Sequence, residues 1–130
     1  MKIVLAVAFG GAIGSLGRYY FADIAERWFA SLLGAGFPYG TIAVNVLGSF
    51  VFGALIESFA VAIMPSAEIR ALVFVGVLGS FTTFSAFSSD TYLLLERGEI
   101  GRALLYIFVS VAISLGAFFV GLRLLRLILA

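Results

Sequence analysis

One segment in the middle of the chain decides the fold: Gly76-Val77-Leu78-Gly79-Ser80-Phe81-Thr82-Thr83-Phe84-Ser85-Ala86-Phe87-Ser88-Ser89. It has no charged residue, so it can lie in a membrane, but its glycine, hydroxyl-bearing and β-branched residues are poor formers of a continuous helix. A break in a membrane helix releases backbone carbonyl groups, which can hold a cation. The segment therefore favours a membrane helix that is broken near its middle. A kinked but unbroken helix is the alternative.

The rest of the chain has the composition of a membrane protein. Of its 130 residues, 63% are hydrophobic and 12% are charged, against about 45–50% and about 25% in a soluble domain. The 8 Lys and Arg residues nearly balance the 7 Asp and Glu residues, and the net charge of +1 argues against a nucleic-acid partner. Because cysteine and histidine are absent, the chain has no thiol nucleophile or imidazole base. We do not expect an enzyme.

Charge-free stretches flank the central segment and predict four membrane helices, since a span needs about 20 mostly apolar residues. The expected spans are residues 3–17, continuing toward Trp28, and residues 41–64, 71–89 and 103–122. Turn-forming residues separate them at 34–40, 65–68 and 96–102. We therefore expect a single four-helix membrane domain over residues 1–130. A cleavable signal peptide is the less favoured interpretation of the N-terminal apolar run.

Basic residues are divided evenly between the two ends of the expected helices. With four spans, one side carries Lys2, Arg70, Arg123 and Arg126, and the other carries Arg18, Arg27, Arg97 and Arg102. Orientation follows Lys and Arg asymmetry, so an even division predicts insertion in both directions and makes an antiparallel homodimer available. If Arg18 lies inside the bilayer, the count instead favours one direction by a single charge.

Polar residues form a stripe on two of the expected helices, at intervals of four. The stripes are Thr41, Asn45 and Ser49 in the second span, and Tyr106, Ser110 and Ser114 in the fourth. The Asn45 amide has more hydrogen-bonding atoms than its own helix can satisfy, so it faces a partner helix, water or a ligand. An interhelical clasp and a ligand-binding role are equally open for Asn45. The hydroxyl stripe of the fourth span lines a path or, as is commoner, packs against a neighbouring helix.

Aromatic and basic residues complete the set of candidates. Phe81, Phe84 and Phe87 recur at intervals of three in the central segment. Such stripes usually contact core or lipid, but the edge of a phenyl ring carries partial positive charge and can stabilise a small anion. Arg18 either anchors the first helix at the membrane interface or attracts anions into a vestibule.

Together these residues resemble the Fluc family of fluoride ion channels, also known as CrcB proteins. The resemblance rests on Gly10-Gly11-x-x-Gly14-x-x-x-Arg18, on Gly40-Thr41-x-x-x-Asn45-x-x-Gly48-Ser49-Phe50 and on Gly79-Ser80-Phe81-Thr82-Thr83-Phe84-Ser85-Ala86-Phe87-Ser88. The third motif is the most specific, and the likeness extends from the first helix to the last. The chain departs from the family in having Ser80-Phe81 and Ala86 where members often have Gly and Thr.

The resemblance implies an all-α integral membrane protein that assembles as an antiparallel, dual-topology homodimer with two fluoride pathways and a central structural sodium ion. It implies these residue roles: Asn45, Phe84, Phe87, Tyr106, Ser110 and Ser114 in the fluoride pathway, the backbone carbonyls of Gly79 and Thr82 as sodium ligands, and Arg18 in the vestibule. The expected function is passive, selective export of cytoplasmic fluoride across a bacterial inner membrane, which relieves fluoride toxicity. The expected partners are fluoride, the lipid bilayer and a second copy.

Two other classes of protein compete with this interpretation. A small dual-topology, proton-coupled multidrug exporter would be expected to place an acidic residue deep in its first helix. No acidic residue precedes Asp23, and Glu57 lies near a helix end. A purely structural membrane subunit would explain the glycines, but not Asn45 together with the Thr82-Thr83-Phe84 region.

Overall fold

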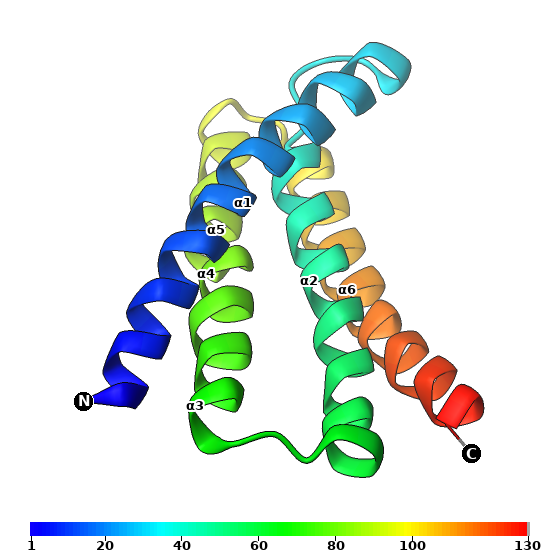
Figure 1. The fold of residues 1–130 in the computed structure, drawn as a ribbon. Helices are drawn as coiled ribbons and strands as arrows, with labels where there is room; N and C mark the ends of the chain where they lie inside the picture. The colour runs from blue at the N-terminus through cyan, green and yellow to red at the C-terminus, as the bar shows by residue number, and fades with distance from the viewer. Residues whose placement is uncertain (130) are drawn as a thin grey trace.

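The computed structural model describes residues 1–129, which form helices joined by short turns (Figure 1). Four helical rods are long and apolar enough to span a membrane: Lys2–Leu33, Tyr39–Ile63, Ala67–Glu96 and Ile100–Leu129. The predicted all-α architecture with four spans is confirmed. Three rods extend well beyond the charge-free stretches that predicted them, because charged residues at helix ends stay helical while their side chains reach toward the interface.

The second and third rods change helix type along their length. In the second rod, α2 (Tyr39–Ser58) continues as a short π-helix, η1 (Phe59–Ile63). The third rod consists of α3 (Ala67–Arg70), the π-helix η2 (Ala71–Leu78), α4 (Gly79–Phe81) and α5 (Phe84–Glu96). The first and fourth rods are the uninterrupted helices α1 (Lys2–Leu33) and α6 (Ile100–Leu129).

The four rods run up and down between two ends of the molecule. The N-terminus, the turn before α3 and the C-terminal end of α6 lie at one end, and the α1–α2 and α5–α6 connections lie at the other (Figure 1). α6 packs along α2, and α1 crosses the third rod against η2. The N-terminal half of α1 and the C-terminal half of α6 diverge from each other (Figure 1).

Glycines let the paired helices approach closely. A Cβ atom on Gly53 of α2 would overlap the Phe118 carbonyl of α6, and a Cβ atom on Gly121 would overlap the Phe50 carbonyl of α2. Gly14 on α1 meets a backbone carbonyl of η2 in the same way. Small residues at helix contacts are how membrane helices gain van der Waals packing where lipid removes the hydrophobic driving force between them.

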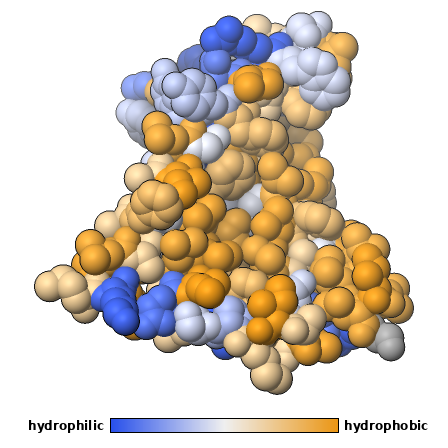
Figure 2. All heavy atoms as spheres, viewed as in Figure 1, coloured by the Kyte–Doolittle hydropathy of each residue, from blue (hydrophilic) through white to orange (hydrophobic). Residues whose placement is uncertain are grey.

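An apolar surface separates two polar ends of the molecule (Figure 2). Large side chains on α1 and α6 face outward, among them Phe9 at 64% exposure and Phe108 at 71% exposure. The buried core is small. One cluster lies near the α5–α6 connection, where Leu94, Ala103 and Tyr106 are fully buried, and Val44 on α2 is buried as well. Such extensive apolar exposure is expected of a surface that contacts lipid or another membrane-embedded chain.

Candidate functional site

The third rod leaves the helical conformation at two consecutive threonines. α4 ends at Phe81, and α5 begins at Phe84. Between them, Thr82 has φ −83° and ψ 157°, and Thr83 has φ −152° and ψ 119°. Both residues are therefore extended. Extended backbone at membrane depth needs hydrogen-bond partners from outside its own helix.

Asn45 on α2 supplies those partners. Its Nδ2 donates to the Thr83 carbonyl at 3.0 Å, and its Oδ1 accepts from the Thr83 N–H at 2.8 Å. One carboxamide thus satisfies both backbone groups of Thr83 and keeps one N–H for a further acceptor. The interhelical clasp considered for Asn45 is present, and the remaining N–H leaves a second, ligand-facing role available to the same side chain.

The hydrogen bonds around Thr83 also change the surroundings of two backbone carbonyls. In a continuous α-helix the Gly79 carbonyl would accept from the Thr83 N–H, and the Thr82 carbonyl from the N–H four residues later. The Thr83 N–H donates instead to Asn45. The N–H of Ala86 donates to the Thr83 hydroxyl at 3.1 Å, which caps the start of α5. The Gly79 and Thr82 carbonyls therefore lack the donor of a continuous α-helix, a state in which carbonyl oxygens suit a hard cation.

A cavity of about 320 Å³ lies beside the extended threonines. Its lining comes from α2, the extended pair, α5 and α6: Asn45, Ser49, Thr82, Thr83, Phe84, Phe87, Ser110, Val111, Ser114 and Leu115. Five of the six side chains predicted for a pathway meet here, although they come from three separate rods. No charged side chain is among these lining residues.

The cavity presents hydroxyl groups and aromatic rings. Ser110 Oγ and Ser114 Oγ are buried without a hydrogen-bond partner among residues 1–129. An unpartnered buried hydroxyl is unfavourable by about 1–3 kcal/mol, so both groups favour a ligand or water in the cavity. The Phe84 and Phe87 rings lie 5.3 Å apart, and the Phe84 side chain is 77% exposed. The donors that the cavity offers are therefore neutral.

Tyr106, the sixth predicted pathway residue, lies next to the cavity and not on its lining. Its buried ring packs 5.4 Å from the Phe87 ring, and its hydroxyl donates to Asp90 Oδ2 at 3.1 Å. The Thr41 hydroxyl donates to the same oxygen at 2.6 Å. Asp90 and Thr41 also line a second cavity of about 420 Å³ near the loops. The polar residues thus continue from one cavity to the other.

Asp90 is the functional candidate that the sequence reasoning missed at this site. Its position three residues after Phe87 places it on the same face of α5 as the cavity-lining ring. That spacing was the available signal. The spacing was overlooked because Asp90 follows Ser88 and Ser89 at the end of the predicted span 71–89, where an acidic residue is expected to face solvent.

Arg18 stands apart from these residues. It lies near the middle of α1, is half-buried, and makes no ion pair or side-chain hydrogen bond within the part of the chain that the structure describes. It lines neither of the two cavities described above. Its vestibule role stays a prediction.

Comparison with known proteins agrees with the motifs that meet at the cavity. The family model described as "CrcB-like protein, Camphor Resistance (CrcB)" matches residues 5–122. The chain belongs to this family. The resemblance inferred from the sequence is thereby confirmed, and the four apolar rods make this CrcB-like chain a multipass membrane protein.

Curated relatives match almost the whole CrcB-like chain. A protein of Rhizobium johnstonii is 48% identical over 122 residues, which cover 94% of this chain and 94% of the relative. A Rhodospirillum centenum protein is 46% identical over 126 residues, 97% of each chain. A Nitrobacter winogradskyi protein is 42% identical over 125 residues, 96% of each chain. Each relative is named "Fluoride-specific ion channel FluC", a channel and not an enzyme, as expected from the residue chemistry.

Replacing Asn45 by Asp is expected to destabilise the contact between α2 and the extended threonines. The carboxylate lacks the donor to the Thr83 carbonyl and sets negative charge against it, so the free energy of unfolding should fall by about 1–3 kcal/mol. Thermal unfolding in detergent measures the change. Ser49→Ala, one turn further along α2 in the same cavity, serves as the control, and an equal loss in both variants would contradict the clasp.

Proposed function

We propose that this CrcB-like chain is a passive, fluoride-selective channel that exports cytoplasmic fluoride across a bacterial inner membrane and so relieves fluoride toxicity. The observation that carries the proposal is the cavity beside Thr82 and Thr83, in which two buried serine hydroxyls have no partner among the described residues. The printed names of the relatives supply the identity of the ion.

The chemistry of the cavity suits a small, strongly hydrated anion. Fluoride must exchange its water for other donors, and the cavity offers the Ser110 and Ser114 hydroxyls and the remaining N–H of Asn45. The ring edges of Phe84 and Phe87 add weak positive potential. Because these donors carry no full charge, the ion is held weakly enough to move on, which conduction requires.

We also propose that two antiparallel copies form the working unit, with one pathway on each side. The surface around the break exposes polar and backbone groups near the middle of the third rod: Gly79, Ser85, Ser88 and Ser89. Polar groups that face lipid are unfavourable, and a second copy would cover them. The basic residues at both ends of the rods are consistent with insertion in either direction.

A structural sodium ion between the two copies is part of the proposal. The carbonyls of Gly79 and Thr82 would hold it, and the support is that the donors of a continuous helix are diverted from both carbonyls to Asn45 and to the Thr83 hydroxyl. When bound, the ion would supply positive charge that stabilises carbonyl oxygens from both copies. The chain's own contribution is the extended conformation of the two threonines.

Purified protein in liposomes is expected to release fluoride down its gradient and to release chloride far more slowly. An ion-selective electrode measures both fluxes, with empty liposomes as the control. Absence of fluoride flux from folded, dimeric protein would end the channel proposal. Fluoride or drug flux that depends on an imposed proton gradient would instead support the proton-coupled exporter.

Changes within the cavity should slow fluoride without disturbing assembly. We expect Ser110→Ala to reduce fluoride flux by about tenfold, the effect of losing one hydrogen bond of about 1.4 kcal/mol to the ion in transit. Phe84→Ile should also reduce flux, because it keeps apolar volume but removes the ring edge.

Controls for these variants lie outside the cavity. Ser58→Ala removes a hydroxyl that donates to the Ala54 carbonyl on α2, and Phe108→Ile alters a ring that is 71% exposed on α6. Both controls should leave fluoride flux unchanged. Wild-type flux in Ser110→Ala and Phe84→Ile would reject the assigned pathway.

Sodium is expected to raise the unfolding temperature of the wild-type protein above its value in N-methylglucamine, because an ion that binds only folded protein stabilises it. Thr83→Val should abolish this difference, since it removes the hydroxyl that diverts the Ala86 N–H from the Thr82 carbonyl. Thr91→Val is the matched control, because the Thr91 hydroxyl donates to the Phe87 backbone carbonyl within α5. A wild-type protein indifferent to sodium would contradict the site.

A further inference from the structure

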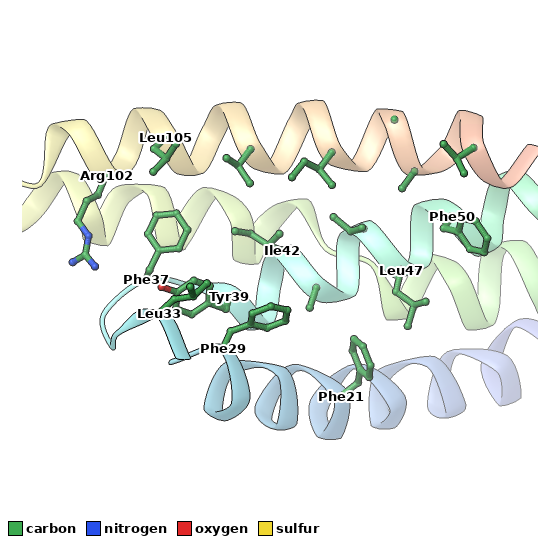
Figure 3. Close-up of a pocket in the computed structure, with 17 residues that line it drawn as sticks. Phe21, Phe29, Leu33, Phe37, Tyr39, Ile42, Leu47, Phe50, Arg102 and Leu105 are labelled. Carbon is green, nitrogen blue, oxygen red and sulfur yellow. The ribbon is translucent and has the colours of Figure 1, made fainter. Parts of the chain in front are cut away.

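A long apolar groove runs over a face of α2 and α6 that differs from the one lining the ion cavity. Its volume is about 1090 Å³, and α1 closes one side of it (Figure 3). On α6 its lining recurs every three or four residues, at Arg102, Leu105, Val109, Ile113, Gly116, Ala117 and Val120. From Arg102 to Val120 this is a length of about 27 Å, at about 1.5 Å per helical residue. The groove therefore crosses most of a hydrocarbon core that is about 30 Å thick.

The groove is polar at one end only. Among its lining residues, Arg102 and Tyr39 alone carry polar side-chain atoms, and both lie at the loop end (Figure 3). The remaining lining is aliphatic, aromatic or glycine. A polar group at interface level followed by a continuous apolar path matches the polarity of a membrane lipid.

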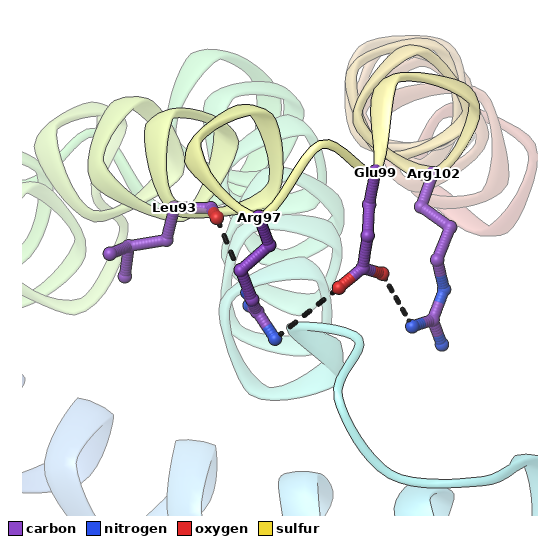
Figure 4. A network of polar contacts seen from close by, with 4 residues as sticks. All are labelled: Leu93, Arg97, Glu99 and Arg102. Carbon is purple, nitrogen blue, oxygen red and sulfur yellow. Dashed lines mark hydrogen bonds and ion pairs between the residues drawn. The ribbon is translucent and has the colours of Figure 1, made fainter.

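Two guanidinium groups meet at the polar end of the groove. Arg102 Nη1 lies 2.7 Å from Glu99 Oε2, and Arg97 Nη1 lies 3.7 Å from Glu99 Oε1 (Figure 4). Two positive charges share one carboxylate, which leaves these three residues a net charge of +1. Arg102 is the one that lines the groove, whereas Arg97 lines the second cavity with Asp23, Glu26 and Asp90. The Arg102 guanidinium also stands 5.9 Å over the Phe37 ring, which lines the groove.

The cluster is open to an anionic ligand. The Arg97 and Arg102 side chains are about half exposed, at 50% and 45%. Both Nη1 atoms border Gly36, where an added Cβ atom would stand 3.9 Å from Arg97 and 3.6 Å from Arg102. Arg97 Nε donates to the Leu93 carbonyl at 3.2 Å. Since glycine has no side chain to cover the Nη1 atoms, the guanidinium N–H groups used by neither Glu99 nor Leu93 can bind phosphate oxygens.

We propose that this groove binds an anionic phospholipid, with the phosphate at Arg102 and an acyl chain along α6. The one-ended polarity and the net positive cluster favour an amphiphile over a helix of a second copy. The polar residues that a second copy would cover also lie on another rod, around Ser85 and Ser88 of α5. Binding of this kind is independent of which ion the cavity conducts.

A pair of fluorescent labels tests the proposal. The chain has no cysteine, so bimane can be attached at Leu105→Cys inside the groove or at Leu104→Cys, which is 62% exposed outside it at nearly the same depth. In phosphatidylcholine bilayers, a small fraction of brominated phosphatidylglycerol should associate about fivefold more strongly near Leu105 than near Leu104. Brominated phosphatidylcholine should show no such preference.

Two charge variants separate phosphate binding from the ion pair itself. Arg102→Gln and Glu99→Gln both break the Arg102–Glu99 contact. Only Arg102→Gln should abolish the phosphatidylglycerol preference at Leu105, whereas Glu99→Gln should keep or strengthen it because the guanidinium is released. Helical circular dichroism and gel filtration confirm that both variants stay folded.

Three results would overturn the proposal. Equal quenching by phosphatidylglycerol at both label positions would mean that only bulk lipid enters the groove. No quenching at Leu105 in a fully brominated bilayer would mean that protein, such as a second copy, covers it. If the phosphatidylglycerol preference at Leu105 persists in Arg102→Gln, the phosphate does not bind at Arg102.

Discussion

The structure of the functional site depends on the pair of hydrogen bonds between the Asn45 carboxamide and the backbone of Thr83. Two extended residues inside a membrane helix would leave polar backbone groups unsatisfied in a medium without water. One side chain on a neighbouring helix resolves this by acting as donor and acceptor at once. The break in the third rod is therefore a property of two helices, because it is stable only while α2 stays in register beside it.

The break organises the groups around it. Thr83 uses its hydroxyl to cap α5, so α5 restarts at Phe84 and places the Phe87 ring against Tyr106 of α6. Both phenylalanines line the cavity that contains Ser110 and Ser114 of α6, whose hydroxyls have no protein partner in the described chain. The groups that line this cavity are therefore neutral. Among residues 1–129, ion pairs lie only outside this cavity, as between Glu57 and Arg126 near the C-terminal end of α6.

Much of the fold and of the site was predictable from the sequence. The stretches without charge located the four spans. Spacing by four residues identified one polar face on the second span, with Asn45, and one on the fourth, with Ser110 and Ser114, and these two faces meet in one cavity. The helix ends were less predictable, because charged residues extend a membrane helix into the interface without changing its apolar length. Asp90 was missed for a related reason. Its partners, Thr41 and Tyr106, are distant in sequence, and the local signal was limited to its spacing of three residues from Phe87.

The sequence by itself determined the class of the protein, a helical membrane chain whose informative residues are neutral and polar, because composition and periodicity control how each segment partitions into lipid. Only the tertiary structure decided which polar groups have hydrogen-bond partners within the protein and which stay available to a ligand. It paired Asn45 with Thr83, left Ser110 and Ser114 without a hydrogen-bond partner among residues 1–129, and placed Arg102 at the polar end of an apolar groove. Hydrogen bonds and cavities arise between helices, so they depend on packing that no single segment encodes.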